Sequence, residues 1–219
     1  MIVYRLTQYT ARLLARTLLR PLQVEGLEHV PRSGPFLLVA NHESVLDPVL
    51  IQAVCPAVVH TMTRSAQFTA PGMGWYMPRL AAFPVRRYQV DPQAVRIALR
   101  RLAAGRPVGV YLEGERSWDG RLQPPRLGTL RLILRAGVPV VPVGVHGSYE
   151  VWPRWAGRPE RGPVRIRFGA PIQFPGPIRN RAERERHVPD VAARMSAELL
   201  RLSDGEPGER VQGAVEKDL

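Results

Sequence analysis

Short apolar runs alternate with amphipathic segments along most of this chain. Residues 36–40, 107–112 and 138–145 are almost continuously apolar, and helical patterns separate them. Strands that are buried on both faces of a parallel sheet have such continuous runs, whereas a helix places its apolar residues three or four positions apart. The alternation therefore predicts an α/β fold: a single domain with a mostly parallel central sheet flanked by helices.

The same pattern predicts the remaining elements. Further strands are expected over 57–63, 81–85 and 164–168, the last as an edge or half-exposed strand, and helices over 48–54, 92–104, 128–136 and 190–202. Residues 21–35 are interpreted as a connector and 64–80 as a helix–loop cover. Asp47 and Asp91 each precede a proline, which is typical of a helix N-cap followed by the first helical residue.

The first 20 residues have a character of their own. Leucines alternate with four arginines, which interrupt any apolar core of a signal peptide, and a basic amphipathic helix on an anionic membrane is predicted. A helix that packs its leucines on the domain is the alternative. The predicted organisation is a membrane-facing helix over 1–20, the α/β domain over 21–202 and a disordered tail over 203–219. No apolar run is long enough for a transmembrane helix.

Charge narrows the class of partner. The 219 residues contain 31 Lys+Arg against 19 Asp+Glu, a net charge of +12. Because arginine binds phosphates and carboxylates through two parallel hydrogen bonds, anionic partners are expected, although a compositional bias towards arginine would give the same count. No nucleic-acid-binding motif is present. The single cysteine, Cys55, excludes an internal disulfide and a CxxC metal site, and we interpret it as a packed core residue.

The polar residues after the run 36–40 suggest catalysis. His42 follows this strand, and Asp47 lies five positions later at a predicted helix start. If the chain turns between them, Asp47 can orient His42 as a general base, although Asp47 could also serve only as a helix cap. Neither a Gly-x-Ser-x-Gly elbow around Ser44 nor an HExxH zinc motif is present, so no metal is expected.

A second polar group follows the run 107–112. Glu113, Gly114, Arg116 and Ser117 combine an acid, a flexible glycine, an arginine and a hydroxyl. Arg116 and Ser117 could hold a phosphate, and Arg86–Arg87, after another predicted strand, could supply a second contact.

These segments resemble the sequence blocks of the glycerolipid acyltransferase family, of the lysophosphatidic acid acyltransferase type. Residues 41–47, Asn-His-Glu-Ser-Val-Leu-Asp, contain the complete Asn-His-x-x-x-x-Asp block, and 111–117, Tyr-Leu-Glu-Gly-Glu-Arg-Ser, resemble Phe-Pro-Glu-Gly-Thr-Arg-Ser. The departures in the latter are Tyr111, Leu112 and Glu115. Residues 81–87 match a Gly-x-x-Phe-Ile-Asp-Arg block weakly, with the arginine at Arg87 or, one position earlier, at Arg86.

Two further blocks lie in the expected order. Residues 140–143 match an apolar Val-Pro-Val block, and Arg126 and Gly128 fall on a Lys-x-Gly. The resemblance covers roughly residues 24–172.

The resemblance implies transfer of a fatty acyl group from acyl-CoA or acyl carrier protein to lysophosphatidate, which gives phosphatidic acid. His42 would be the base and Asp47 its orienting partner. Arg87, Glu113, Gly114, Arg116 and Ser117 would bind the acceptor. No bound cofactor is implied, only an acyl donor, a lysophospholipid acceptor and an anionic membrane surface at the cytoplasmic face of the cell membrane, to which the enzyme would be peripheral or monotopic.

Two other functions stay open from the sequence. The same chemistry could act on another lysolipid, an ornithine lipid or a glycolipid, because Glu115 replaces a threonine beside the proposed phosphate site. A non-enzymatic protein that binds anionic surfaces would explain the charge but not the motifs.

Overall fold

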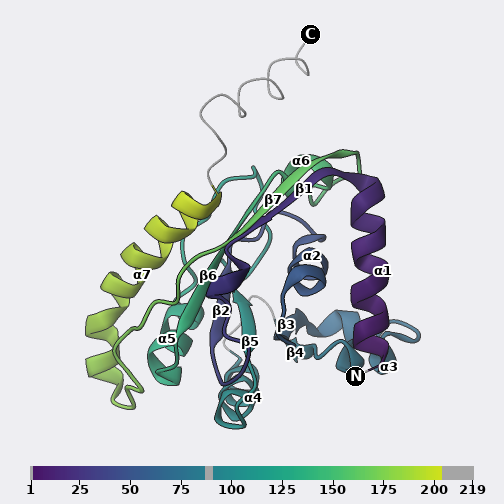
Figure 1. Ribbon diagram of the computed structural model, residues 1–219. Coiled ribbons are helices and arrows are strands. Elements are labelled where there is room, and N and C mark those ends of the chain that lie inside the picture. Colours follow the sequence, from purple (N-terminus) through teal and green to yellow (C-terminus); the bar gives the residue numbers. More distant parts are fainter. Residues whose placement is uncertain (1, 87–90, 204–219) are drawn as a thin grey trace.

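The computed structural model describes residues 2–86 and 91–203 and shows a seven-stranded sheet flanked by helices (Figure 1). The strands are β1 (Leu19–Glu25), β2 (Leu37–Ala40), β3 (His60–Arg64), β4 (Phe83–Val85), β5 (Val108–Tyr111), β6 (Val140–His146) and β7 (Gly162–Phe168). The α-helices are α1 (Ile2–Leu18), α2 (Asp47–Val54), α3 (Met73–Arg79), α4 (Pro92–Ala103), α5 (Leu127–Ala136), α6 (Ser148–Val151) and α7 (Arg181–Ser203). Two short 3₁₀ turns, η1 (Leu27–His29) and η2 (Ser65–Phe68), complete the described elements.

The strand order is β1-β7-β6-β2-β5-β3-β4, and every described pair is parallel except β6 with β7. This confirms the predicted single α/β domain with a mostly parallel sheet. The apolar runs occupy the centre, where β6, β2 and β5 are neighbours. All four residues of β2 are buried, as its uninterrupted apolar sequence requires.

Side chains of the central strands alternate between two cores, one on each face of the sheet. Leu38 and Ala40 of β2 belong to the core that includes residues of α1 and α2, whereas Leu37 and Val39 belong to the core that includes residues of α4, α5 and α7. Figure 1 accordingly shows α1 and α2 on one side of the sheet and α5 and α7 on the other. The carboxyl edge of the sheet lies between these layers.

The prediction of a connector over 21–35 is wrong for its first residues, because Leu19–Glu25 form the edge strand β1 beside β7. Pro21 obscured the signal, but an edge strand tolerates proline, and the pairing with β7 is irregular between Leu19 and Leu22. Consequently β7 is not an edge strand. Its alternating pattern instead reflects one half-exposed face, where Arg165 and Arg167 bond to Gln23 and Glu25 of β1.

The N-terminal helix packs on α2 through a polar and small-residue stripe. Tyr4, Gln8, Ala11 and Ala15 are buried. The Gln8 amide donates to the carbonyl oxygens of Gln52 (2.8 Å) and Cys55 (3.2 Å) at the end of α2. The side chains of Ile2, Leu6, Tyr9 and Leu13 are exposed. α1 thus docks through residues other than these apolar ones.

The predicted tail lies outside the described residues from 204 onwards, while Ser203 is the buried last residue of α7. Among the described residues, no helix combines the length and the apolar character needed to cross a membrane.

Candidate active site

Polar side chains from three neighbouring strands meet at the carboxyl edge of the sheet. His42 follows β2, Glu113 follows β5, and Ser148 follows β6, and β2 lies between the other two strands. His42, Glu113 and Ser148 are all buried. In parallel sheets this edge is where functional groups collect, and here it brings together residues more than 100 positions apart in sequence.

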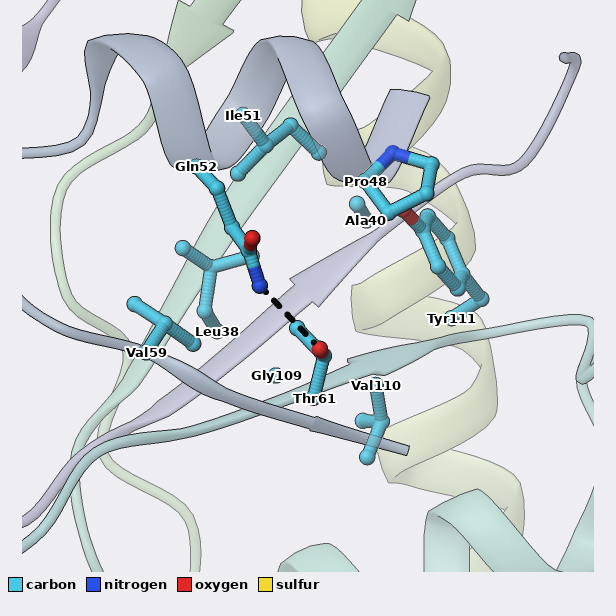
Figure 2. A pocket seen from close by; sticks show the side chains of 10 residues that line it. All are labelled: Leu38, Ala40, Pro48, Ile51, Gln52, Val59, Thr61, Gly109, Val110 and Tyr111. Carbon is cyan, nitrogen blue, oxygen red and sulfur yellow. Dashed lines mark hydrogen bonds between the residues drawn. The ribbon is translucent and has the colours of Figure 1, made fainter. Parts of the chain in front are cut away.

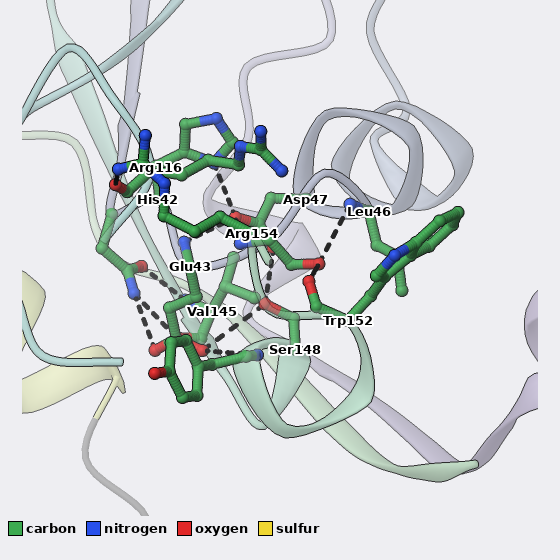
Figure 3. Close-up of polar contacts among 12 residues, drawn as sticks. His42, Glu43, Leu46, Asp47, Arg116, Val145, Ser148, Trp152 and Arg154 are labelled. Carbon is green, nitrogen blue, oxygen red and sulfur yellow. Dashed lines mark hydrogen bonds and ion pairs between the residues drawn. The ribbon is translucent and has the colours of Figure 1, made fainter. Parts of the chain in front are cut away.

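His42 and Asp47 form the centre of this group (Figure 3). His42 Nδ1 lies 2.8 Å from Asp47 Oδ2, and both side chains are buried. The same oxygen accepts hydrogen bonds from the backbone N–H groups of Glu43 (2.7 Å) and Ser44 (2.8 Å). The chain therefore turns between His42 and Asp47, as their proposed pairing needed.

The sequence pattern predicts Asp47 as the N-cap of α2, and this prediction is wrong. The helix begins at Asp47 itself, and the N-cap residue is Leu46. The carboxylate bonds backwards, to N–H groups of the turn that carries His42, rather than forwards into the helix. Its role in the turn thus replaces the expected capping role.

Ser148 holds the other oxygen of Asp47. Its hydroxyl donates to Asp47 Oδ1 over 2.6 Å and lies 3.4 Å from Glu43 Oε2. Four donors consequently surround the Asp47 carboxylate, and they fix the face that it presents to His42. Ser148 was not predicted from the sequence, although it follows an apolar run just as His42 does.

Asn41 and Glu43 tie the His42 turn to β6. The Asn41 side chain donates to the carbonyl oxygen of Val145 (2.8 Å) and accepts from its N–H (2.7 Å), as a backbone partner would. Asn41 also donates to Glu43 Oε1 over 3.3 Å. Burial, followed by the nearby Asp47 carboxylate, raises the pKa of Glu43 well above its usual value. Both effects favour the neutral form of the Glu43 carboxyl group.

The imidazole of His42 is held on a second side by β5. Its ring stacks on Tyr111 with centroids 3.8 Å apart and planes inclined by 13°. The carbonyl oxygen of His42 accepts a 2.7 Å hydrogen bond from the N–H of Ser117. With Nδ1 turned towards Asp47, Nε2 points to the opposite side of the ring, where a proton can be exchanged.

Glu113 and Gly114 begin the loop after β5. Burial raises the pKa of Glu113 to about 8, and within the described chain neither carboxyl oxygen has a hydrogen-bond partner. Gly114 has φ +73°, and a Cβ atom there would lie 2.5 Å from Cδ of Arg126. The positive φ therefore favours glycine, and a larger residue would also displace the Arg126 side chain.

Ser117 and Arg116 follow in the same loop. The Ser117 hydroxyl is fully buried and donates to the carbonyl oxygen of Arg121 (2.8 Å), so it shapes the loop. The carbonyl oxygen of Arg116 accepts from Nη1 of Arg154, 3.2 Å away. Arg154 lies after α6 and was not singled out from the sequence.

The two arginines of the weak block are not both described. Arg87 lies outside the described residues, so its position relative to His42 stays a prediction. Arg86 pairs with Asp91: its N–H donates to Asp91 Oδ2 over 2.8 Å, and its Nε lies 3.5 Å from the same oxygen. No group of three or more metal-ligating side chains is found in the described parts of the chain.

Comparisons with known proteins identify a family that matches this chain. A sequence profile of the Acyltransferase family matches residues 21–146. A chloroplastic 1-acyl-sn-glycerol-3-phosphate acyltransferase from Brassica napus is 32% identical over 155 residues, which are 68% of this chain and 44% of that protein. The alpha form of that enzyme from Homo sapiens is 26% identical and covers 70% of this chain and 56% of its own length. The chain thus spans about half the length of these relatives.

A crystal structure of the 1-acyl-sn-glycerophosphate acyltransferase PlsC from Thermotoga maritima superimposes with a TM-score of 0.72 at 27% identity. The match covers 90% of this chain and 79% of that one. Since the family profile spans more than half of the chain, including His42, Asp47, Glu113 and Arg116, this chain belongs to the Acyltransferase family.

Proposed function

We propose that this protein transfers a fatty acyl group from acyl-CoA or acyl carrier protein to the free hydroxyl of lysophosphatidate, giving phosphatidic acid for phospholipid synthesis. The observation that carries the proposal is the buried His42–Asp47 pair at the carboxyl edge of the sheet, in a member of this family. The curated relatives and the structural neighbour named above support the choice of acceptor.

The reaction needs one base. His42 Nε2 takes the proton of the acceptor hydroxyl while the oxygen attacks the thioester carbonyl of the donor. The tetrahedral oxyanion collapses to the ester and expels the donor's thiolate, which receives the proton from the imidazolium. Asp47 holds the tautomer with the proton on Nδ1 and stabilises the transient imidazolium charge across the 2.8 Å hydrogen bond.

The loop after β5 is the proposed site of the acceptor headgroup. Arg116 would bind its phosphate, with Arg87 as a second contact, and Gly114 would allow close approach of the ligand. Because the pKa of Glu113 is about 8, its carboxyl group is mostly protonated at pH 7. It can then donate a hydrogen bond to an acceptor oxygen without repelling the phosphate. Ser117 would act through the shape of the loop.

A small apolar pocket lies beneath α2, close to the site (Figure 2). It is lined by residues of α2, β2, β3 and β5, and its volume of about 10 Å³ has room for about one water molecule. Tyr111, which stacks on His42, lies at one side of it. A Cβ atom on Gly109 would come within 2.9 Å of Val59 Cγ1, so a larger residue there would crowd the lining of the pocket.

The N-terminal helix supports peripheral attachment to an anionic bilayer. Its stripe of Ile2, Leu6, Tyr9 and Leu13 is 54–85% exposed. Val45 and Val49, in the turn after His42 and in α2, are also exposed apolar residues. An amphipathic helix of this kind lies in the interface with its apolar stripe in lipid. We propose that the enzyme works in this way at the cytoplasmic face of the membrane, where its acceptor is found.

A different acceptor for the same chemistry is the second candidate, and Glu115 is the observation that favours it. A carboxylate beside the proposed phosphate site would suit another lysolipid, an ornithine lipid or a glycolipid. A panel of such acceptors, offered with one acyl donor, separates the two functions by their relative kcat/KM.

The direct test is acyl transfer from radiolabelled acyl-CoA or acyl carrier protein to lysophosphatidate, with the wild type and His42→Ala. Loss of the base is expected to lower kcat about 10²- to 10⁴-fold, because general-base catalysis contributes that much. His187→Ala in α7 removes an imidazole on the other side of the sheet and serves as the control. Full activity of His42→Ala would overturn the mechanism, and transfer only to another acceptor would select the second candidate.

A further inference from the structure

Glu115 has a cationic partner that the sequence did not reveal. Its Oε2 lies 3.8 Å from Nη1 of Arg154, in the segment between α6 and β7. The Arg154 side chain is 17% exposed and that of Glu115 is 28% exposed, so solvent screens this charge pair less than it would screen one on the open surface. The negative charge beside the proposed phosphate site is thereby compensated.

Arg154 also holds the backbone of the same loop. Its Nη1 donates to the carbonyl oxygen of Arg116 over 3.2 Å. The N–H of Ser117, which belongs to the same planar peptide unit, donates to the carbonyl oxygen of His42 over 2.7 Å. One peptide plane is therefore fixed from both sides, by Arg154 and by the turn that carries the proposed base.

Trp118 fixes the guanidinium itself. The Cζ atom of Arg154 lies 3.2 Å from the centre of the Trp118 ring, in a cation–π arrangement. Planar stacking with hydrogen bonds from the rim of the group is a geometry that arginine provides and lysine does not. Figure 3 shows Arg154 together with Arg116 and His42 at the site.

We propose that Arg154 is a positioning residue for the acceptor: it fixes the Arg116–Ser117 peptide relative to His42 and compensates Glu115, so that Arg116 can bind the acceptor's phosphate. The proposal rests on the proposed function and deepens it. It explains how this chain accommodates a glutamate where the family pattern has threonine. Arg154 itself touches the loop and not the reacting atoms.

The test separates binding from turnover. Arg154→Met is expected to raise the KM for lysophosphatidate at least about tenfold, since it removes a charge-assisted hydrogen bond to the loop and a cationic partner of Glu115. The kcat and the KM for the acyl donor are expected to stay within about threefold, because His42 and Asp47 are untouched. Arg158→Met, which removes an equal charge from an exposed position four residues later, is the matched control and is expected to change neither.

Two further variants measure how much Glu115 contributes to acceptor binding. Glu115→Thr combined with Arg154→Met removes both charges. Its KM for lysophosphatidate is expected to be at least about threefold lower than that of Arg154→Met alone. Arg154→Lys keeps the positive charge but lacks the planar guanidinium group, so its KM for lysophosphatidate is expected to lie between those of the wild type and Arg154→Met. It also replaces Arg154→Met if that variant does not fold. An unchanged acceptor KM in both Arg154 variants, or an equal effect of Arg158→Met, would overturn the proposal.

Binding of lysophosphatidate without an acyl donor, measured by calorimetry, distinguishes this proposal from the proposed function. If the wild type transfers no acyl group but binds lysophosphatidate, and Arg154→Met weakens that binding, the positioning role stands and the reaction is wrong. If the wild type does not bind lysophosphatidate, both are overturned.

Discussion

Asp47 shows how much one buried side chain can organise. It accepts from His42, from two N–H groups of the turn and from Ser148, so it shapes the loop and orients the imidazole at once. The spacing of five residues between His42 and Asp47 suggested a pair but also an ordinary helix cap. The local turn decides for the pair, because the N–H groups of Glu43 and Ser44 donate to the same Asp47 oxygen as His42. Ser148, 101 positions away in sequence, holds the other oxygen.

Glu113 gives a prediction at the residue scale. Burial raises its pKa from 4.5 to about 8, so the folded protein binds a proton that the unfolded chain has released in this range. The contribution of protonated Glu113 to the free energy of unfolding is therefore fully present below about pH 4.5, and it is lost as the pH rises through about 8. Glu113→Gln cannot ionise, so its free energy of unfolding is expected to fall less steeply over this window.

Urea unfolding of wild type and Glu113→Gln across this pH range measures the difference. Glu43, whose pKa is also raised, retains part of the dependence in the variant. The exposed Glu160→Gln is the control and is expected to follow the wild type. Parallel curves for Glu113→Gln and wild type would show that Glu113 ionises normally in the folded protein.

At the scale of elements, the apolar runs predicted the central strands, whereas one edge strand with proline and polar residues was missed. The central strands β2, β5 and β6 were predicted within a few residues, because burial on both faces leaves little freedom in their composition. β1 was missed because it contains Pro21 and polar residues, which an edge strand tolerates. The four-residue helix α6 is too short to leave a periodic pattern.

The exposed stripe of α1 gives a prediction for an element. Leu6→Ser with Leu13→Ser is expected to weaken binding to anionic vesicles at least about tenfold, because each leucine is worth about 1.5–3 kcal/mol when fully buried in an apolar environment. Neither side chain packs in the core, so the unfolding temperature is expected to stay close to that of the wild type. Cosedimentation with vesicles measures the binding.

The control for this prediction is Leu200→Ser, an exposed leucine on α7. It is expected to bind vesicles as the wild type does. Equal binding by the α1 double variant would place the membrane contact elsewhere on the protein.

At the scale of the whole molecule, the net charge of +12 predicts how binding depends on salt. Each basic residue near an anionic bilayer contributes about 1 kcal/mol, and this attraction is screened over about 8 Å at physiological ionic strength. Binding to anionic vesicles is expected to weaken steadily with added salt, and binding to neutral vesicles to depend on it little. DNA binding of similar strength with no acyl transfer would instead favour a general binder of anionic surfaces.

Sequence by itself determined the fold class, the central strands, the His42–Asp47 pair and the Glu113–Ser117 loop, because burial and local turns constrain neighbouring residues directly. Tertiary structure alone decided that Ser148 and Arg154 join the site, that β1 closes the edge of the sheet, and which stripe of α1 faces solvent. These features arise from the strand order, which brings distant segments together through contacts that leave no periodic trace in either segment.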